Sequence, residues 1–229
     1  MSRPSTRRRT STSTGSWARS SSSSGSGPRP APPPPRSAAE GIVLSPRPIG
    51  VPVEGITDGV VRLRLIADAD IPAITRACQD PAIQRYTTVP SPYEERHARE
   101  WLTAAAAGMS AGTDLALLVV DAGKGDLLGS VGLHSIDPAT GRCSAGYWVT
   151  EAARGRHVAK RALRLLCRFG FDELDLRRIE LWIEPENTGS VGVAESLGFV
   201  REGVLRSFMV VGGRRRDMLM YSLLPGDVA

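Results

Sequence analysis

The sequence predicts an α/β domain of the mixed (α+β) type, with a central, mostly antiparallel sheet, one parallel pair of strands and helices on both faces. Two observations lead to this prediction. Most segments with the apolar pattern of strands are separated only by short turn sequences, which join antiparallel neighbours. One strand–helix–strand unit, over residues 143–184, must instead join two parallel strands, because a helical crossover returns the chain to the same end of the sheet.

The first strand and the first two helices have distinct signals. Residues 60–67 alternate apolar side chains with arginines, which is typical of a half-buried strand. Asp68 is a suitable N-cap for a helix over residues 69–80. Residues 93–108 predict a second helix, with acidic residues early and Gly108 near its end.

The later elements follow from the same patterns. Apolar runs bounded by turn residues predict strands, and apolar residues at helical spacing predict helices. In chain order they are the strands 114–121, 127–137 and 142–150, the helix 158–173, the strand 178–184, the helix 188–197, and a hairpin of 200–211 and 214–224. The predicted domain covers residues 58–229, which is enough for a hydrophobic core of its own.

Residues 1–57 are predicted to be a disordered tail and linker. Residues 1–40 are rich in Ser, Thr, Pro, Gly and Arg, with seven arginines and a single acid, so they have little apolar area to offset chain entropy. The net charge of +5 therefore comes from this segment, and the rest of the chain is nearly neutral. Two other interpretations of residues 1–40 are an organellar transit peptide and a segment upstream of the true start of the protein. Nucleic-acid binding through the tail is a rival function that a basic tail alone supports weakly.

The cysteines and the apolar runs bear on the compartment. Cys78, Cys143 and Cys167 form no Cys-x-x-Cys pair, and we expect buried free thiols of a reducing compartment. No apolar run reaches the roughly 18 residues that span a bilayer. No secretory hydrophobic region follows the N-terminal arginines. We expect a cytoplasmic protein without membrane contact and without a metal site.

A short turn between a strand and a helix is the most informative stretch. The strand ends at Val149, and the helix begins near Val158 with its first amides unpaired and the positive end of its dipole exposed. Gly155 and the small Ala159 allow close backbone approach. The arrangement predicts a site for a compact anion such as a pyrophosphate. An ordinary loop with solvated arginines is the alternative, and the GxGxxG and GK[ST] patterns are absent.

This turn, "RGRHVA", resembles the acetyl-CoA loop Arg/Gln-x-x-Gly-x-Gly/Ala of the GNAT family of N-acetyltransferases. Further segments, "AGYWVTEAARGRHVAKRAL", "IELWIEPENTGSVGVAESLGFVREGVLR" and "RRRDMLMYSLL", resemble its ribosomal-protein (RimJ/RimL-like) branch in the same order. The resemblance covers residues 58–224. It implies a sheet that splays between strands 143–149 and 179–184, with acetyl-CoA in the splay.

The resemblance also implies which residues bind acetyl-CoA. The pantetheine amides would pair with backbone around Tyr147, Trp148 and Val149. The pyrophosphate would accept backbone amides from Arg154, Gly155, Arg156, His157, Val158 and Ala159. Two further residues, Asn187 and Ser190, match an Asn-x-x-Ser motif near the thioester. Ser190 would be the proton donor to the leaving thiolate. Helix capping by Ser190 and a turn role for Asn187 are the alternatives.

The sequence departs from the family pattern at three positions. His157 stands at a glycine-like position of the loop. Either only its backbone amide would face the phosphates, or its imidazole would face them as well. Ser144 stands where relatives often carry a glutamate that acts as a base through water. Ala194 stands where many relatives carry a tyrosine acid. The resemblance therefore supplies no base.

Two residues are candidates for the missing base. His134 has a side chain suited to proton transfer, although a hydrogen-bonded strand-end histidine is the plainer interpretation. Glu184 could face the cleft or be a solvated strand end. A free amine that binds already deprotonated would need no base. Tyr86, Trp101 and Trp182 could line an acceptor pocket or belong to the core.

The sequence therefore predicts an enzyme, an acetyl-CoA-dependent N-acetyltransferase. Its acceptor would be a primary amine, either a protein N-terminus such as that of a ribosomal protein, or a small molecule. A non-catalytic acyl-CoA-binding regulatory domain is the rival, motivated by the losses at positions 144 and 194. The choice between monomer and homodimer stays open.

Overall fold

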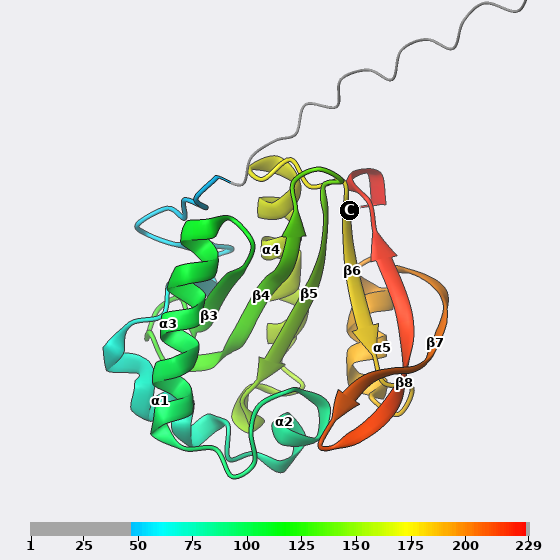
Figure 1. Ribbon diagram of the computed structural model, residues 1–229. Coiled ribbons are helices and arrows are strands. Elements are labelled where there is room, and N and C mark those ends of the chain that lie inside the picture. The colour runs from blue at the N-terminus through cyan, green and yellow to red at the C-terminus, as the bar shows by residue number, and fades with distance from the viewer. Residues whose placement is uncertain (1–46, 228–229) are drawn as a thin grey trace, which may run out of the picture. The chain divides into compact units, whose positions relative to one another are not determined.

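The computed structural model describes residues 47–227, and their centre is one eight-stranded sheet (Figure 1). The strands are β1 (Ile56–Thr57), β2 (Val61–Arg64), β3 (Leu115–Asp121), β4 (Leu127–Asp137), β5 (Arg142–Val149), β6 (Arg178–Ile183), β7 (Val200–Val211) and β8 (Arg214–Leu223). Their order is β1-β2-β3-β4-β5-β6-β8-β7. Every neighbouring pair in this sheet is antiparallel except β5 and β6. The predicted mixed sheet with one parallel pair is confirmed.

Helices cover both faces of the sheet (Figure 1). The helices α1 (Ile71–Ala77) and α3 (Glu95–Ala111) pack on one face, and α4 (Val158–Asp172) and α5 (Thr188–Ser196) pack on the other. The short helix α2 (Pro81–Tyr86) lies at the end of the sheet where β5 and β6 terminate. Three single turns of 3-10 helix are η1 (Asp68–Asp70), η2 (Glu151–Ala153) and η3 (Pro225–Asp227).

The apolar stripe of α4 explains its position over the sheet. Ala162, Leu163 and Leu166 recur at helical spacing and are at most 1% exposed in the larger core cluster. Burying a leucine side chain contributes about 1.5–3 kcal/mol. On the opposite face Ile71 and Ile74 of α1 pack in a second cluster with strand residues. The predicted free cysteines are buried in these cores.

The region predicted as one helix over residues 69–80 is instead η1 and α1, and a separate α2 follows. Arg64 donates one hydrogen bond to each carboxylate oxygen of Asp70, both at 2.7 Å, and this ion pair holds η1 in place. Asp80 accepts the Ala82 amide at 2.8 Å and caps α2, in which Pro81 occupies the first position.

The second helix continues past Gly108, contrary to the prediction. It ends at Ala111, because Gly112 adopts the left-handed conformation at φ 73° that commonly terminates helices. Gly108 lies inside the helix, where an added Cβ would come within 2.7 Å of the Asp114 Cβ. Its small size therefore serves close packing rather than helix termination.

Part of the predicted linker packs against the domain. Ile49 is 7% exposed and donates its amide to the Met109 carbonyl at 2.9 Å. The strand β1 pairs with β2. The boundary expected at residue 58 therefore falls inside the packed unit, while the predicted tail over residues 1–46 lies outside the described residues.

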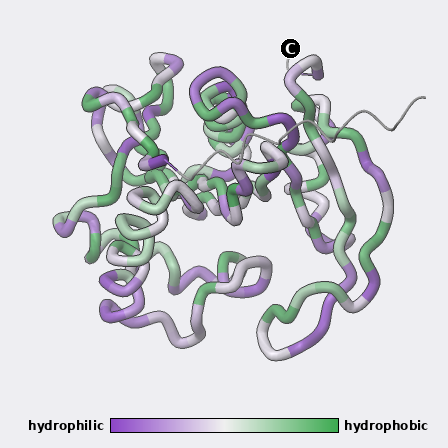
Figure 2. The backbone as a smooth tube through the Cα atoms, turned by 45° about the horizontal axis from the view of Figure 1, so that its top comes forward, coloured by the Kyte–Doolittle hydropathy of each residue, from purple (hydrophilic) through white to green (hydrophobic). Residues whose placement is uncertain are grey.

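The β7–β8 hairpin forms one edge of the sheet, with short hydrophilic and hydrophobic runs alternating along it (Figure 2). A bulge interrupts its pairing between Leu205 and Met209. Ser207 in the bulge has φ 53° and donates its amide to Asp217 at 2.7 Å. The bulge brings the Phe208 ring to 5.0 Å from the indole of Trp182 on β6, in an edge-to-face arrangement.

Candidate active site

The parallel strands β5 and β6 pair over only three residues and then separate (Figure 1). The last pair joins Ser144 to Glu180, although β5 continues to Val149 and β6 to Ile183. Beyond Ser144, the edge of β5 that faces β6 has no strand partner in the described chain. The splay predicted from the resemblance is therefore present, at the predicted strands.

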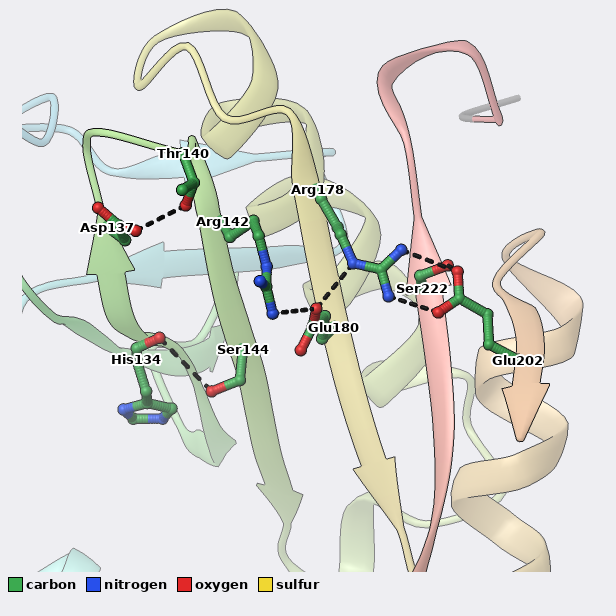
Figure 3. Close-up of polar contacts among 9 residues, drawn as sticks. All are labelled: His134, Asp137, Thr140, Arg142, Ser144, Arg178, Glu180, Glu202 and Ser222. Carbon is green, nitrogen blue, oxygen red and sulfur yellow. Dashed lines mark hydrogen bonds and ion pairs between the residues drawn. The ribbon is translucent and has the colours of Figure 1, made fainter. Parts of the chain in front are cut away.

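A polar network closes the narrow end of the splay (Figure 3). Glu180 is 4% exposed and accepts hydrogen bonds from Arg142 at 3.0 Å and from Arg178 at 2.7 Å. Arg178 also pairs with Glu202 on β7, which accepts the Ser222 hydroxyl at 2.7 Å. A buried carboxylate without such partners would be costly, so the two arginines allow Glu180 to hold β5 and β6 together here.

A cleft of about 930 Å³ occupies the open end of the splay. Its walls come from β3 to β6, the β7–β8 hairpin, the segment from α1 to α3, the turn after β5 and the start of α5. The three aromatic residues considered for an acceptor pocket, Tyr86, Trp101 and Trp182, all line it. The Trp182 Nε1 and Tyr147 Oη atoms are buried without a hydrogen-bond partner of good geometry among the described residues. Both are polar groups that a bound substrate could reach only if neighbouring side chains move.

The predicted anion-binding turn lies directly after β5 and η2. Gly155 and His157 both have left-handed backbones, with φ of 71° and 59°. Such residues turn successive amides toward one side. The Arg161 amide is the first of α4 to find an acceptor in the described chain, the His157 carbonyl at 3.0 Å. A Cβ added to Gly155 would meet nothing within 4 Å, so open space adjoins the turn.

The arginines of this turn are engaged with the protein itself. Arg154 forms an ion pair with Asp80, the cap of α2. Arg156 contacts the Ala152 carbonyl at 3.4 Å. Arg161, in the first turn of α4, pairs with Asp58 at 2.7 Å. The capacity of the turn for an anion therefore resides in its backbone amides.

Tyr147 and Ser190 lie near each other across the splay. Burial raises the pKa of Tyr147 to about 12, and the nearby Ser190 side chain opposes this shift. Asn187 is the N-cap of α5 and accepts the Ser190 amide at 3.2 Å. The capping function considered for Ser190 thus belongs to Asn187, and both residues line the cleft.

The candidate base Glu184 is not a solvated strand end. It is 4% exposed, and both of its oxygens accept from Arg85 Nη1 at 2.8 Å. Arg216 of β8 approaches it at 3.9 Å. The Arg85 guanidinium therefore occupies both oxygens of this carboxylate. His134, the other candidate, lines the cleft and is 48% exposed in its side chain.

Sequence reasoning missed that α2 spans the open end of the splay. One end of α2 is tied to the turn after β5 through Asp80 and Arg154, and the other to the end of β6 through Arg85 and Glu184. The Asp80–Pro81 dipeptide was the available signal, because an N-cap followed by proline typically starts a helix. Nothing in the local sequence indicates the two ion pairs.

The splayed sheet and the amide-rich turn define an N-acetyltransferase type of domain. Residues 61–200 match the family described as "Acetyltransferase (GNAT) domain". The chain is 30% identical over 164 residues to "Uncharacterized N-acetyltransferase p20" of Bacillus licheniformis, covering 72% of this chain and 91% of that protein. The chain belongs to the GNAT family and is an acetyl-CoA-dependent N-acetyltransferase.

Other relatives carry names that differ in acceptor. "Putative ribosomal N-acetyltransferase YdaF" of Bacillus subtilis is 34% identical over 100 residues, 44% of this chain and 55% of that one. "Spermidine N(1)-acetyltransferase" of Escherichia coli is 27% identical over 95 residues, 42% of this chain and 51% of that one. A solved structure of a putative ribosomal-protein-serine acetyltransferase from Vibrio cholerae superimposes with a TM-score of 0.69 at 22% identity, covering 77% of this chain and all of that one. That likeness shows the fold.

Neither a membrane span nor a metal site emerges from the part of the chain described. No helix within residues 47–227 combines the length and apolar character needed to cross a bilayer. No group of three or more His, Cys, Asp or Glu side chains in the same range could hold a metal ion.

Proposed function

We propose that this chain transfers the acetyl group of acetyl-CoA to the α-amino group of a protein or peptide N-terminus. The observation that carries the proposal is the neutralised carboxylate of the cleft. Glu184 is paired with Arg85, so Glu100 is the one carboxylate among the described lining residues without an ion pair. A polyamine carries several positive charges and would need several unpaired carboxylates.

The basicity of the acceptor points the same way. An α-amino group has a pKa of about 7.7–8.0 and an alkylamine such as lysine about 10.4. At pH 7.5 roughly a third of the first is neutral, but only about one part in a thousand of the second. With Ser144 in place of an acid and Glu184 held by Arg85, the cleft favours the amine that loses its proton more easily.

The described residues fit acetyl-CoA at two places. The edge of β5 over Tyr147, Trp148 and Val149 has unpaired backbone that can pair with the pantetheine amides. The amides that follow Arg154, from Gly155 through Arg156, His157 and Val158 to Ala159, have no protein acceptor in the described chain and can hold the pyrophosphate. When bound, acetyl-CoA supplies the activated thioester.

Ser190 and Asn187 complete the proposed site. Asn187 caps α5 and so fixes the backbone of Ser190, whose hydroxyl would donate a proton to the departing sulfur. Holding the amine and the thioester together in one cleft supplies much of the remaining rate acceleration.

The test is a comparison of acceptors by thiol release from acetyl-CoA. Peptides that begin with Ala or Ser should be acetylated with a kcat/KM at least tenfold above that for spermidine. Mass spectrometry should place the acetyl group on the α-amine. A preference for spermidine would show a polyamine acetyltransferase, and the absence of turnover with either class would refute the proposed acceptor.

A further inference from the structure

We propose that His134 is the general base of the transfer and that Asp114 is the residue that positions it. The inference rests on the proposed function, because it concerns how the α-amine loses its proton. The observations behind it are the orientation of the imidazole on the sheet, the carboxylate at its Nδ1, and the way the other titratable groups of the cleft are occupied.

Two glycines give the imidazole its position. His134 lies on β4 opposite Ser144 of β5 (Figure 3), and the next pair on the same face of the sheet joins Gly132 to Gly146. A Cβ on Gly132 would lie 3.2 Å from His134 Nε2, and a Cβ on Gly146 would lie 3.5 Å from it. The ring therefore lies over two residues without side chains, with Nε2 close to both, and all four residues line the cleft.

A carboxylate stands at the other ring nitrogen. Asp114, just before β3, places Oδ1 at 3.6 Å from His134 Nδ1. The same oxygen accepts the Ser135 amide at 3.2 Å, so the carboxylate is itself held in place. Ser135 has φ 52°, at the start of the irregularity in the pairing of β4 with β5, and this turn of the backbone aims its amide at Asp114. A carboxylate at Nδ1 leaves Nε2 free to accept a proton and stabilises the imidazolium that results.

The remaining titratable groups of the cleft are less suited. His97 on α3 uses Nδ1 to accept the Glu94 amide at 3.0 Å. Burial raises the pKa of Cys78 to about 11 and that of Tyr147 to about 12. Glu184 is held by Arg85. Glu100 lies on α3, apart from the strands that form the splay.

The acceptor nitrogen forms a bond to the acetyl carbon while the C–S bond breaks. His134 Nε2 takes the proton of the α-ammonium group and later releases it to water. The departing sulfur takes the Ser190 hydroxyl proton, and Ser190 regains a proton through water from the acylated nitrogen, so both residues return to their starting state. An imidazole is a side chain suited to proton transfer near neutral pH.

The experiment is the pH dependence of kcat and of kcat/KM for an Ala-initiated peptide in the native protein, His134→Gln and Asp114→Asn. His134→Gln should lower kcat about 100-fold at pH 7.5. Its deficit should shrink above pH 9, where the peptide amine is already neutral. Asp114→Asn keeps an acceptor for the Ser135 amide; it should lower kcat about tenfold and move the acidic limb of the profile to lower pH, because the imidazolium loses its counter-charge.

Controls separate this inference from a loss of fold and from the proposed function. The dissociation constant for acetyl-CoA should stay within twofold of the native value in both variants. His97→Gln should retain the acidic limb of the native pH profile. Native-like turnover and profile in His134→Gln would overturn the inference while leaving the proposed function intact. A lower kcat in Asp114→Asn without any shift of the acidic limb of the pH profile would show that Asp114 has a purely structural role. The absence of turnover by the native protein would instead refute the proposed function.

Discussion

Replacing His157 by glycine tests the strain in the turn that precedes α4. His157 has φ 59° and ψ 16°, a left-handed conformation that costs a non-glycine residue roughly 1–2 kcal/mol. Glycine loses about 0.5–1 kcal/mol more than other residues in chain entropy on folding. The difference predicts that His157→Gly stabilises the protein by about 0.5–1 kcal/mol, which is roughly 1–4 °C in Tm for a domain of this size.

The assay is thermal and urea unfolding of the native protein, His157→Gly and His157→Ala. Alanine keeps the Cβ that makes this conformation costly, so it should not reproduce the gain. Calorimetric titration with acetyl-CoA should give an equal or lower dissociation constant for the glycine variant, since the backbone amide at this position is preserved.

Two results would refute the reasoning. Equal gains from alanine and glycine would show that the imidazole, rather than the backbone, is the source of any strain. A weakening of acetyl-CoA binding by more than tenfold in His157→Gly would show that the imidazole itself contacts the cofactor.

Three further predictions concern the site, the closed end of the splay and the N-terminal segment. Ser190→Ala should lower kcat about 10- to 100-fold in steady-state assays at an unchanged KM for acetyl-CoA, and an unchanged kcat would remove Ser190 from the mechanism. The hydrogen bonds from Arg178 lower the pKa of Glu202 from 4.5 to about 2. This pair therefore stabilises the fold fully above pH 4.5 and loses its effect as the pH falls toward 2, so Glu202→Gln should flatten the acid limb of stability measured by urea unfolding. Deleting residues 1–46 should leave Tm within about 2 °C of the native value, whereas deleting residues 1–57 removes a buried isoleucine and β1 and should cost about 2 kcal/mol or more; equal Tm values would show that this segment adds no stability.

The parts of the fold that were predicted correctly depend on residues that are close together in the sequence. The parallel pair follows from a single helical crossover, and the turn after β5 follows from Gly155 beside the start of an apolar stripe. The helix α2 was missed, because the predicted helix ended at Asp80 and the N-cap and proline of Asp80–Pro81 were not used as the start of another helix.

The parts that could not be predicted depend on register. Asp114 and His134 are twenty residues apart and meet only because β3 pairs with β4 and the backbone turns at Ser135. Glu184 was expected at a solvated end, and its burial results from Arg85 of α2, almost a hundred residues away in the chain. Polar contacts of this kind have no periodic signal in the sequence.

Because β5 and β6 pair at only three positions, the sheet consists of two blocks of strands, and these blocks are also separate in the sequence. The strands β1 to β5 come from residues before 150, and β6 to β8 come from residues after 177. A ligand between the two blocks acts as a missing strand, so acetyl-CoA should serve as a scaffold as well as a reactant. At a concentration one hundred times its dissociation constant, a ligand adds about 2.7 kcal/mol to stability. Resistance of this protein to proteolysis should therefore rise and fall with the acetyl-CoA supply around it.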